Sequence, residues 1–180
     1  MNRLASECAQ MLRQGLALVE RIDDCLYAEA LPEAPRGAVG AHLRHCLDFY
    51  RGLLAGLGTG RIDYNARARD PLVERDRAHA SAALQSVICE LEELPDEAGD
   101  EVVLVAPEDA ADDPTDEAAW ARSTVARELQ FLLSHTVHHF ALLALTLRLR
   151  GFEPGAEFGV NSSTLRHWRH EEEEAAACAR

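Results

Sequence analysis

The stretch that most constrains this chain is Arg127–Arg150, RELQFLLSHTVHHFALLALTLRLR, which is apolar on nearly every face and carries three histidines near its middle. Each residue of an α-helix turns the side chain by about 100°, so His135 and His139 lie within about 40° of each other, one turn apart. Polar and small side chains gather on one narrow side, which we expect to face water: Gln130, Ser134, Ala141 and Arg148. The two histidines therefore point into the core, among Phe131, Leu132, Leu142, Leu143 and Leu149.

Two imidazoles in an apolar core need partners, because a buried polar group without a hydrogen bond or a metal loses its hydration without compensation. One interpretation is that they are core histidines, hydrogen-bonded to neighbours such as Glu128 or Thr146. The other is a metal site, since H-x-x-x-H on a helix places two nitrogens within reach of one ion. The spacing alone leaves both interpretations open. His138 lies near the border of the wheel, and we interpret it as a surface or interface histidine.

Three further helices are predicted from apolar residues that repeat every three or four positions. They run from about Asn2 to Ala28, from about Gly37 to Leu57, and from a cap at Asp76 to about Leu94. Each of these helices has an apolar stripe that must be buried against another element. Together with the histidine helix they predict an all-α bundle of four helices.

The connections between the helices carry two further predictions. The segment 61–76, RIDYNARARDPLVERD, is rich in charge and turn residues and predicts a long crossover loop. Val102–Val105 and Trp120–Thr124 predict a short β-hairpin around an acidic turn, with Ser123 or Thr124 capping the histidine helix. We expect one bundle domain over residues 1–155. Residues 156–180 would form a C-terminal loop and charged tail that packs on the bundle or extends from it.

The charge of the chain excludes several classes of function. A net charge of −13 argues against a general binder of nucleic acid or anionic membranes, which needs clustered cations. All 18 cationic residues are arginine, so Schiff-base chemistry and a phosphate-loop lysine are excluded. The chain shows no signal-peptide pattern and no apolar run long enough to span a bilayer, so we expect a cytoplasmic protein without membrane contact.

A third ligand for the metal interpretation would come from the second helix, which carries His42 and His45. Three positions apart, these side chains are about 60° apart on the wheel, and either could face the histidine helix. The apolar centre of the wheel lies nearer His42, so amphipathicity slightly favours His42. Arg44 and Asp48 are expected on the opposite, polar face.

A family resemblance favours His45 instead. Val39-Gly40-x-x-x-x-His45-x-x-Asp48, followed by H-x-x-x-H near the start of a later helix, resembles the DinB/YfiT-like superfamily of metal-binding four-helix bundles. The resemblance implies an up-and-down bundle with a long crossover, and a homodimer. It also implies that His45, His135 and His139 hold a divalent ion, which would be zinc, nickel or iron. His42 stays a rival ligand or a residue of the pocket.

The resemblance extends to the DinB-like domain of the sulfoxide synthases that make thiohistidines, which shares an A-H-L-R-H stretch with residues 41–45. In those enzymes the later histidine of that stretch is the ligand. This chain departs from them at Ala141, where they have an acidic residue, and it lacks their large catalytic domain. Their activity is therefore not implied.

The resemblance also implies a class of reaction, because the family includes thiol-dependent transferases and isomerases. The leading hypothesis is a metal-dependent transferase or hydrolase that acts on a small molecule, with a low-molecular-weight thiol as a partner. Glu128 would be a carboxylate that supports a ligand, and the loop around Tyr64 would be a lid. No catalytic residue is assigned.

Two other classes compete with this hypothesis. One is a dimeric bundle that binds metal without catalysing a reaction. The other is DNA binding, because the string from Gly159 to Trp168 resembles part of a helix-turn-helix, although the net charge opposes it and no preceding partner helix is evident.

Overall fold

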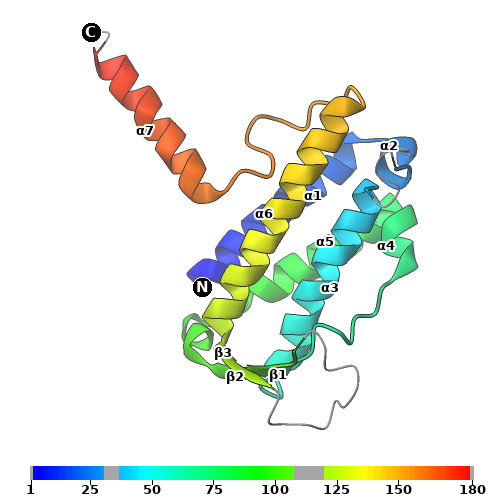
Figure 1. Cartoon of the computed structure of the whole chain (residues 1–180), viewed down its shortest axis with the longest axis vertical. Coiled ribbons are helices and arrows are strands. Elements are labelled where there is room, and N and C mark those ends of the chain that lie inside the picture. The colour runs from blue at the N-terminus through cyan, green and yellow to red at the C-terminus, as the bar shows by residue number, and fades with distance from the viewer. Residues whose placement is uncertain (1, 31–36, 108–119, 179–180) are drawn as a thin grey trace.

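Four long helices form the body of the protein, in a computed structural model that describes residues 2–30, 37–107 and 120–178. They are α1 (Arg3–Arg21), α3 (Val39–Leu57), α5 (Arg77–Glu92) and α6 (Val125–Leu149). Helices α1 and α3 each pack against both α5 and α6 (Figure 1). The predicted four-helix bundle is therefore confirmed. Its centre is filled by leucines contributed by every helix, and these include Leu12, Leu43, Leu84 and Leu129.

The first predicted helix is shorter than expected, because the chain breaks after Arg21. Ile22 is extended, and the side chain of Asp23 accepts a hydrogen bond from the backbone N–H of Leu26 at 2.8 Å. Asp23 thereby caps a separate helix, α2 (Asp24–Ala28). An aspartate at this position stabilises a helix start better than a helix interior, which explains the break that the apolar spacing did not reveal.

The predicted crossover loop contains two short elements, so the loop prediction was only partly correct. Strand β1 (Arg61–Ile62) opens the segment, and helix α4 (Pro71–Arg75) closes it. Asp70 caps α4, and Pro71 is its first residue, a position where a proline fits because its missing N–H would have no partner there. Asp76 caps α5 as predicted, accepting from the backbone of Ala78 and His79.

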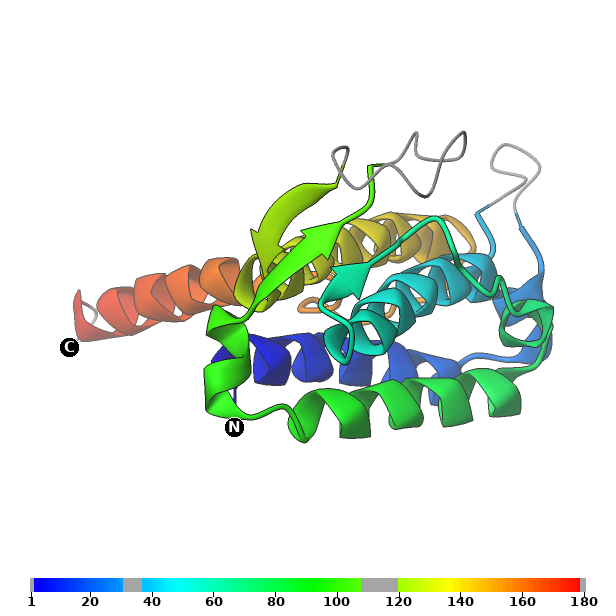
Figure 2. The ribbon, with the colours of Figure 1, turned by 90° about the horizontal axis from the view of Figure 1, so that it is seen from below.

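The predicted hairpin is confirmed and belongs to a three-stranded sheet. Strand β2 (Val102–Val105) pairs antiparallel with β3 (Ala121–Thr124), and β1 pairs in parallel with β2. A 3-10 helix, η1 (Asp96–Asp100), precedes β2. The sheet covers one end of the bundle, where α6 begins (Figure 2). Most of the acidic turn between β2 and β3, residues 108–119, lies outside the described part of the chain.

Beyond α6 the chain first folds back onto the bundle and then leaves it. The ring of Phe158 stacks on Phe140 with centroids 5.1 Å apart, and the backbone N–H of Gly159 donates to Gln14. Helix α7 (Ser162–Cys178) then projects away from the bundle (Figure 1). The division into a domain and a tail at residue 155 stays a prediction. Among the described helices, none is long and apolar enough to cross a membrane.

Candidate metal centre

Helix α6 begins where the sequence predicted and carries its histidines on one edge. Thr124 caps the helix by accepting from the backbone N–H of Arg127. The residues predicted to face water are exposed: Gln130, Ser134, Ala141 and Arg148. Two leucines predicted to point inward are not buried, since Leu142 is 40% exposed and Leu149 is 71% exposed. The face that packs on the core is centred on Leu132, Thr136 and Leu143, so the histidines lie at its border.

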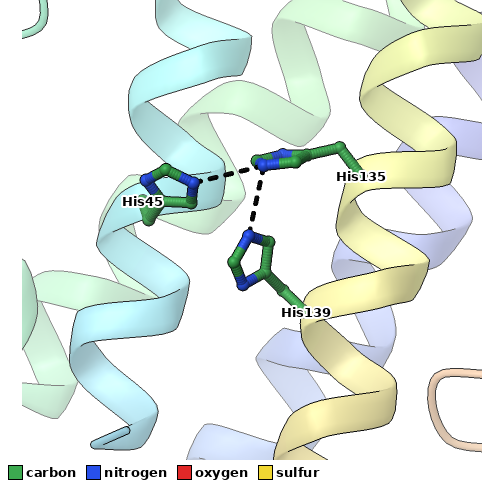
Figure 3. Close-up of side chains that lie close together, drawn as sticks. All are labelled: His45, His135 and His139. Atoms are coloured by element: carbon green, nitrogen blue, oxygen red, sulfur yellow. Dashed lines mark hydrogen bonds between the residues drawn. The ribbon is translucent and has the colours of Figure 1, made fainter. Parts of the chain in front are cut away.

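The three predicted ligands come together between α3 and α6 (Figure 3). The Nε2 atom of His135 lies 3.2 Å from Nε2 of His45 and 3.1 Å from Nε2 of His139. Their potential ligand atoms all lie within 4.8 Å of one another, so one divalent ion could contact all three. Each side chain is half-buried.

The fourth histidine, His42, lies behind this cluster. Its Nδ1 atom is 2.8 Å from Nδ1 of His139, whereas His139 uses its other nitrogen to face His135. His42 is not one of the three residues whose ligand atoms converge. The slight preference of the helical wheel for His42 is therefore not realised in the geometry. A hydrogen bond to the far nitrogen of a ligand fixes the orientation of its ring, which is the role this contact would have.

The three converging imidazoles are electrically neutral at pH 7. Loss of hydration on burial and, to a smaller extent, the nearby histidines lower the pKa of His45, His135 and His139 to about 4. A neutral imidazole has a lone pair to give to a metal, whereas a protonated one has none. The centre is therefore ready to bind a cation at neutral pH.

Protein groups alone leave this cluster incompletely bonded, which fits a metal. A neutral imidazole carries one hydrogen, so three Nε2 atoms that face one another cannot all be satisfied among themselves. The Nδ1 atom of His135 is buried and has no hydrogen-bond partner within the described residues. A divalent ion would take up all three Nε2 lone pairs, and three histidine ligands leave a coordination position open.

If His135 and His139 were ordinary core histidines, Glu128 or Thr146 would be expected to hydrogen-bond to them, but both residues bond elsewhere. Glu128 accepts hydrogen bonds from the hydroxyl groups of Tyr64, at 2.9 Å, and Ser123, at 2.6 Å. The Thr146 hydroxyl donates to the backbone oxygen of Leu142 at 3.0 Å. The predicted support of a ligand by Glu128 is likewise not seen as a direct hydrogen bond, because both carboxylate oxygens are held by these hydroxyl groups.

Helix α3 is held in place by the residues that flank His45. A side chain on Gly40 would clash with the backbone oxygen of Glu74, so only glycine lets α3 approach α4 this closely. Arg44 pairs with Glu74 and, at 2.6 Å, with Asp48. Asp48 was predicted on a polar face, but its side chain is 1% exposed. The paired guanidinium compensates that burial and anchors the turn that presents His45.

A pocket of about 730 Å³ opens on one side of the centre, against His45 and His135. Its wall includes Glu128 and also Tyr64, whose loop the sequence suggested as a lid, a role that stays a prediction. Burial, and then the charge of Glu128, raise the pKa of the Tyr64 hydroxyl, which therefore stays protonated. A second pocket of about 670 Å³ lies on the side of His42 and His139. The centre is thus reached from two sides.

The comparison with known families agrees with this arrangement. A family model described as the DinB superfamily matches residues 9–143. The chain belongs to the DinB superfamily. The match runs from α1 into α6 and contains all three converging histidines, while α7 lies outside it. No curated protein and no solved structure matched the chain. The DinB membership shown here covers the fold and not a reaction.

Two pocket residues of this DinB protein were missed by the sequence reasoning. The ring of Phe49 lies 5.0 Å from that of His45 and 4.6 Å from that of His135. Phe49 is four residues after His45 in α3, so helical spacing could have placed it beside the ligand. Arg67 also lines the pocket, but it lies in a segment without periodicity, where no sequence signal pointed to it.

The lowered pKa values predict that the metal-free DinB protein loses stability in mild acid. The ordinary histidine pKa is 6.5 and the folded value is about 4, so between these limits the unfolded chain binds protons that the folded centre does not. The free energy of unfolding is therefore unaffected by these groups above pH 6.5 and falls as the pH drops towards 4. Denaturant titrations of the metal-free protein at pH 7.5, 5.5 and 4.5 measure this loss.

The matched control for this prediction is His135→Phe, which removes one of the three groups and keeps a ring in place. Its stability should fall less steeply over the same range, whatever other groups titrate there. An equally steep fall in both proteins would mean that His135 does not have the lowered pKa.

Proposed function

We infer that this DinB protein is a divalent-metal-dependent transferase that joins a small thiol to an electrophilic molecule. The observation that supports this most directly is the convergence of His45, His135 and His139 beside a pocket of about 730 Å³. A closed structural site would have no room for a reactant next to the ligands, whereas a three-histidine site with an adjacent pocket has the layout of catalytic centres.

A divalent ion at this centre would act as a Lewis acid that lowers the pKa of a thiol or water bound to it. The protein supplies three neutral ligands, so the full positive charge of the ion remains available to stabilise a thiolate. His42 would hold the ring of His139 in position through the 2.8 Å contact. The metal is proposed to be zinc, nickel or iron, all of which accept imidazole ligands.

The side chains of the larger pocket favour thiol transfer over hydrolysis. In transfer, the sulfur forms a bond to carbon, the leaving group departs with its electron pair, and the thiol proton passes to solvent. Hydrolysis often needs a side chain that protonates a poor leaving group. Within the described lining, the two side chains that could do this are Tyr64 and Glu128. The Tyr64 hydroxyl already donates its proton to Glu128 in a hydrogen bond of 2.9 Å, so the pair is not arranged to protonate a leaving group.

The test is a rate measurement on protein loaded with zinc, nickel or iron. Glutathione or cysteine is mixed with chlorodinitrobenzene, and formation of the thioether is followed by absorbance, while nitrophenyl acetate reports hydrolysis. We expect metal-dependent thioether formation that returns to the metal-free rate in His135→Ala. Faster ester cleavage without thioether formation would show a hydrolase instead. A fully loaded protein with neither activity against a wide panel of thiols and electrophiles would contradict the proposal.

A second candidate, a metal-binding homodimer without catalytic activity, has support from α6. Leu142, Leu145 and Leu149 are exposed along one stripe of this helix, with Leu145 59% and Leu149 71% exposed. An apolar stripe of this kind is what a partner surface would cover. Sedimentation of the wild type beside Leu145→Glu tests the dimer, and an inactive dimer with a full metal complement would favour this candidate.

The DNA-binding hypothesis receives no support from the arrangement of α7. Residues 150–161 separate α6 from α7, whereas a helix-turn-helix joins its helices by a turn of about 3–4 residues. The four consecutive glutamates at 171–174 would also repel DNA phosphates.

A further inference from the structure

The larger pocket combines aromatic walls with unmatched positive charge. The ring of Phe49 lies 5.1 Å from Tyr64 and 6.0 Å from Phe131, measured between centroids. These rings form an apolar surface that runs up to His135, whose ring lies 5.7 Å from that of Phe131. A ligand body placed here would contact aromatic carbon on one side and the metal centre on the other.

Arg67 supplies a positive charge beside this aromatic surface. Its guanidinium carbon lies 5.0 Å from the centroid of Phe49. Its Nε atom is buried and has no hydrogen-bond partner in the described part of the chain. A buried donor without a partner costs free energy, and no hydrogen bond from the described residues offsets that cost at this atom. Arg67 lines the same pocket as His45 and His135.

Many other arginines of the protein pair with an acidic side chain, which Arg67 does not do among the described residues. Acidic partners are found for Arg3, Arg13, Arg44, Arg77, Arg148, Arg150 and Arg169. Among the described residues that line the pocket, Arg67 and Arg127 are accompanied by one carboxylate, Glu128, whose oxygens already accept from Tyr64 and Ser123. The described lining therefore carries two guanidinium charges and one carboxylate charge, a net charge of +1. The pocket is therefore a local attractor for anions.

The loop that carries Arg67 is held in place by hydrogen bonds of two earlier residues, Tyr64 and Asn65. The backbone N–H of Asn65 donates to the side chain of Asp63 at 2.8 Å, and the Asn65 amide donates to the backbone oxygen of Pro107 at 2.9 Å. Tyr64 is bound to Glu128 of α6. These bonds tie the loop to the turn after β2 and to the bundle. Less ordering is then required when a ligand binds, which strengthens binding.

We propose that this pocket binds a small organic carboxylate, whose carboxylate group pairs with the guanidinium of Arg67 and whose apolar body lies against Phe49 and Phe131. The fork of an arginine matches a carboxylate with two parallel hydrogen bonds, which a lone point charge does not. The proposal rests on the proposed function only in identifying this ligand as one of the two reactants at the metal centre. The binding itself requires no metal.

The test compares two probes of equal shape on the metal-free protein. Calorimetry measures the affinity for phenylpropionate and for its neutral analogue phenylpropionamide. We expect the carboxylate to bind at least about tenfold more tightly, as a charge-assisted hydrogen bond implies. Arg67→Gln should abolish this preference, and Arg67→Lys should restore only part of it. Arg122→Gln is the matched control, because Arg122 is an exposed arginine of β3 outside the pocket lining, and the preference should persist in it.

A repeat on the zinc-loaded protein separates this site from the metal centre. A carboxylate preference that appears only with zinc and survives in Arg67→Gln would place the carboxylate on the metal and overturn the proposal. Absence of any preference in the wild type would overturn it as well. Equal unfolding temperatures and zinc contents of wild type and Arg67→Gln verify that the variant is folded. An inactive protein that keeps the preference would refute the proposed reaction and leave this binding site intact.

Discussion

In His135→Ala, the affinity for zinc is expected to fall by more than about 100-fold. Loss of a residue that only hydrogen-bonds to a ligand weakens metal binding by about 10–100-fold, and loss of the ligand itself should cost more. His135 is the central member of the cluster, since its Nε2 atom lies within 3.2 Å of Nε2 in both His45 and His139. Its loss leaves two ligands, which hold a divalent ion far more weakly than three. Elemental analysis after gel filtration, combined with zinc titration against a competing chelator, measures the change.

Two variants on the same helices sharpen this result. His138→Ala is the matched control, because His138 is exposed on α6 and lies outside the converging set, so its zinc content should equal that of the wild type. His42→Ala should retain one bound ion with an affinity about 10–100-fold weaker, as expected when the residue that orients a ligand is lost. Unchanged zinc in His135→Ala, or zinc lost only in His42→Ala, would mean that the centre has been assigned to the wrong histidines.

Metal loading is expected to raise the unfolding temperature by about 8–16 °C. An ion that binds only the folded state adds about 4 kcal/mol when its free concentration is 1,000 times the Kd. A chain of 180 residues gains about 2–4 °C for each kcal/mol. The ion would connect α3 to α6, which are joined in the unfolded chain only through a long intervening segment. Calorimetric scans of protein with excess zinc and with chelator measure the difference.

The same scans on His45→Ala and His138→Ala provide the comparison. The first variant should respond little to zinc, and the second should respond as strongly as the wild type. Equal stabilisation of His45→Ala and wild type would show that zinc acts somewhere other than between α3 and α6.

The sequence predicted the bundle and a shared side for His135 and His139 because both follow from helical periodicity. His135 and His139 are four residues apart, so any helix places them on one side, and the resemblance supplied His45 from α3. The ends of the helices were harder to predict from the sequence. The break at Asp23 and the strand β1 depend on single side chains and on pairing with β2, and neither leaves a periodic pattern. Local capping and long-range pairing thus decided what periodicity could not.

The side chains around the centre were predicted less well, for a related reason. The helical wheel placed Leu142 and Leu149 of α6 in the core, yet both are exposed because α3 and the core cover only part of that helix. Asp48 was expected in water, but it is buried through its pairing with Arg44. Arg67 reaches the pocket from a loop, and only the fold brings that loop beside His45. Burial of this kind depends on neighbours that are distant in the sequence.

The larger pocket is lined by two kinds of element. The metal ligands project from α3 and α6, whose inner faces are part of the central packing, whereas Tyr64 and Arg67 belong to the loop that follows β1, a strand of only two residues. Regions with few interlocked neighbours open far more often than the interior does, as amide exchange reveals in many proteins. Opening of this loop would break only its few hydrogen bonds to Glu128 and Pro107 and would leave α3 and α6 in place. Exchange of a ligand in the pocket would then not require the three histidines to separate.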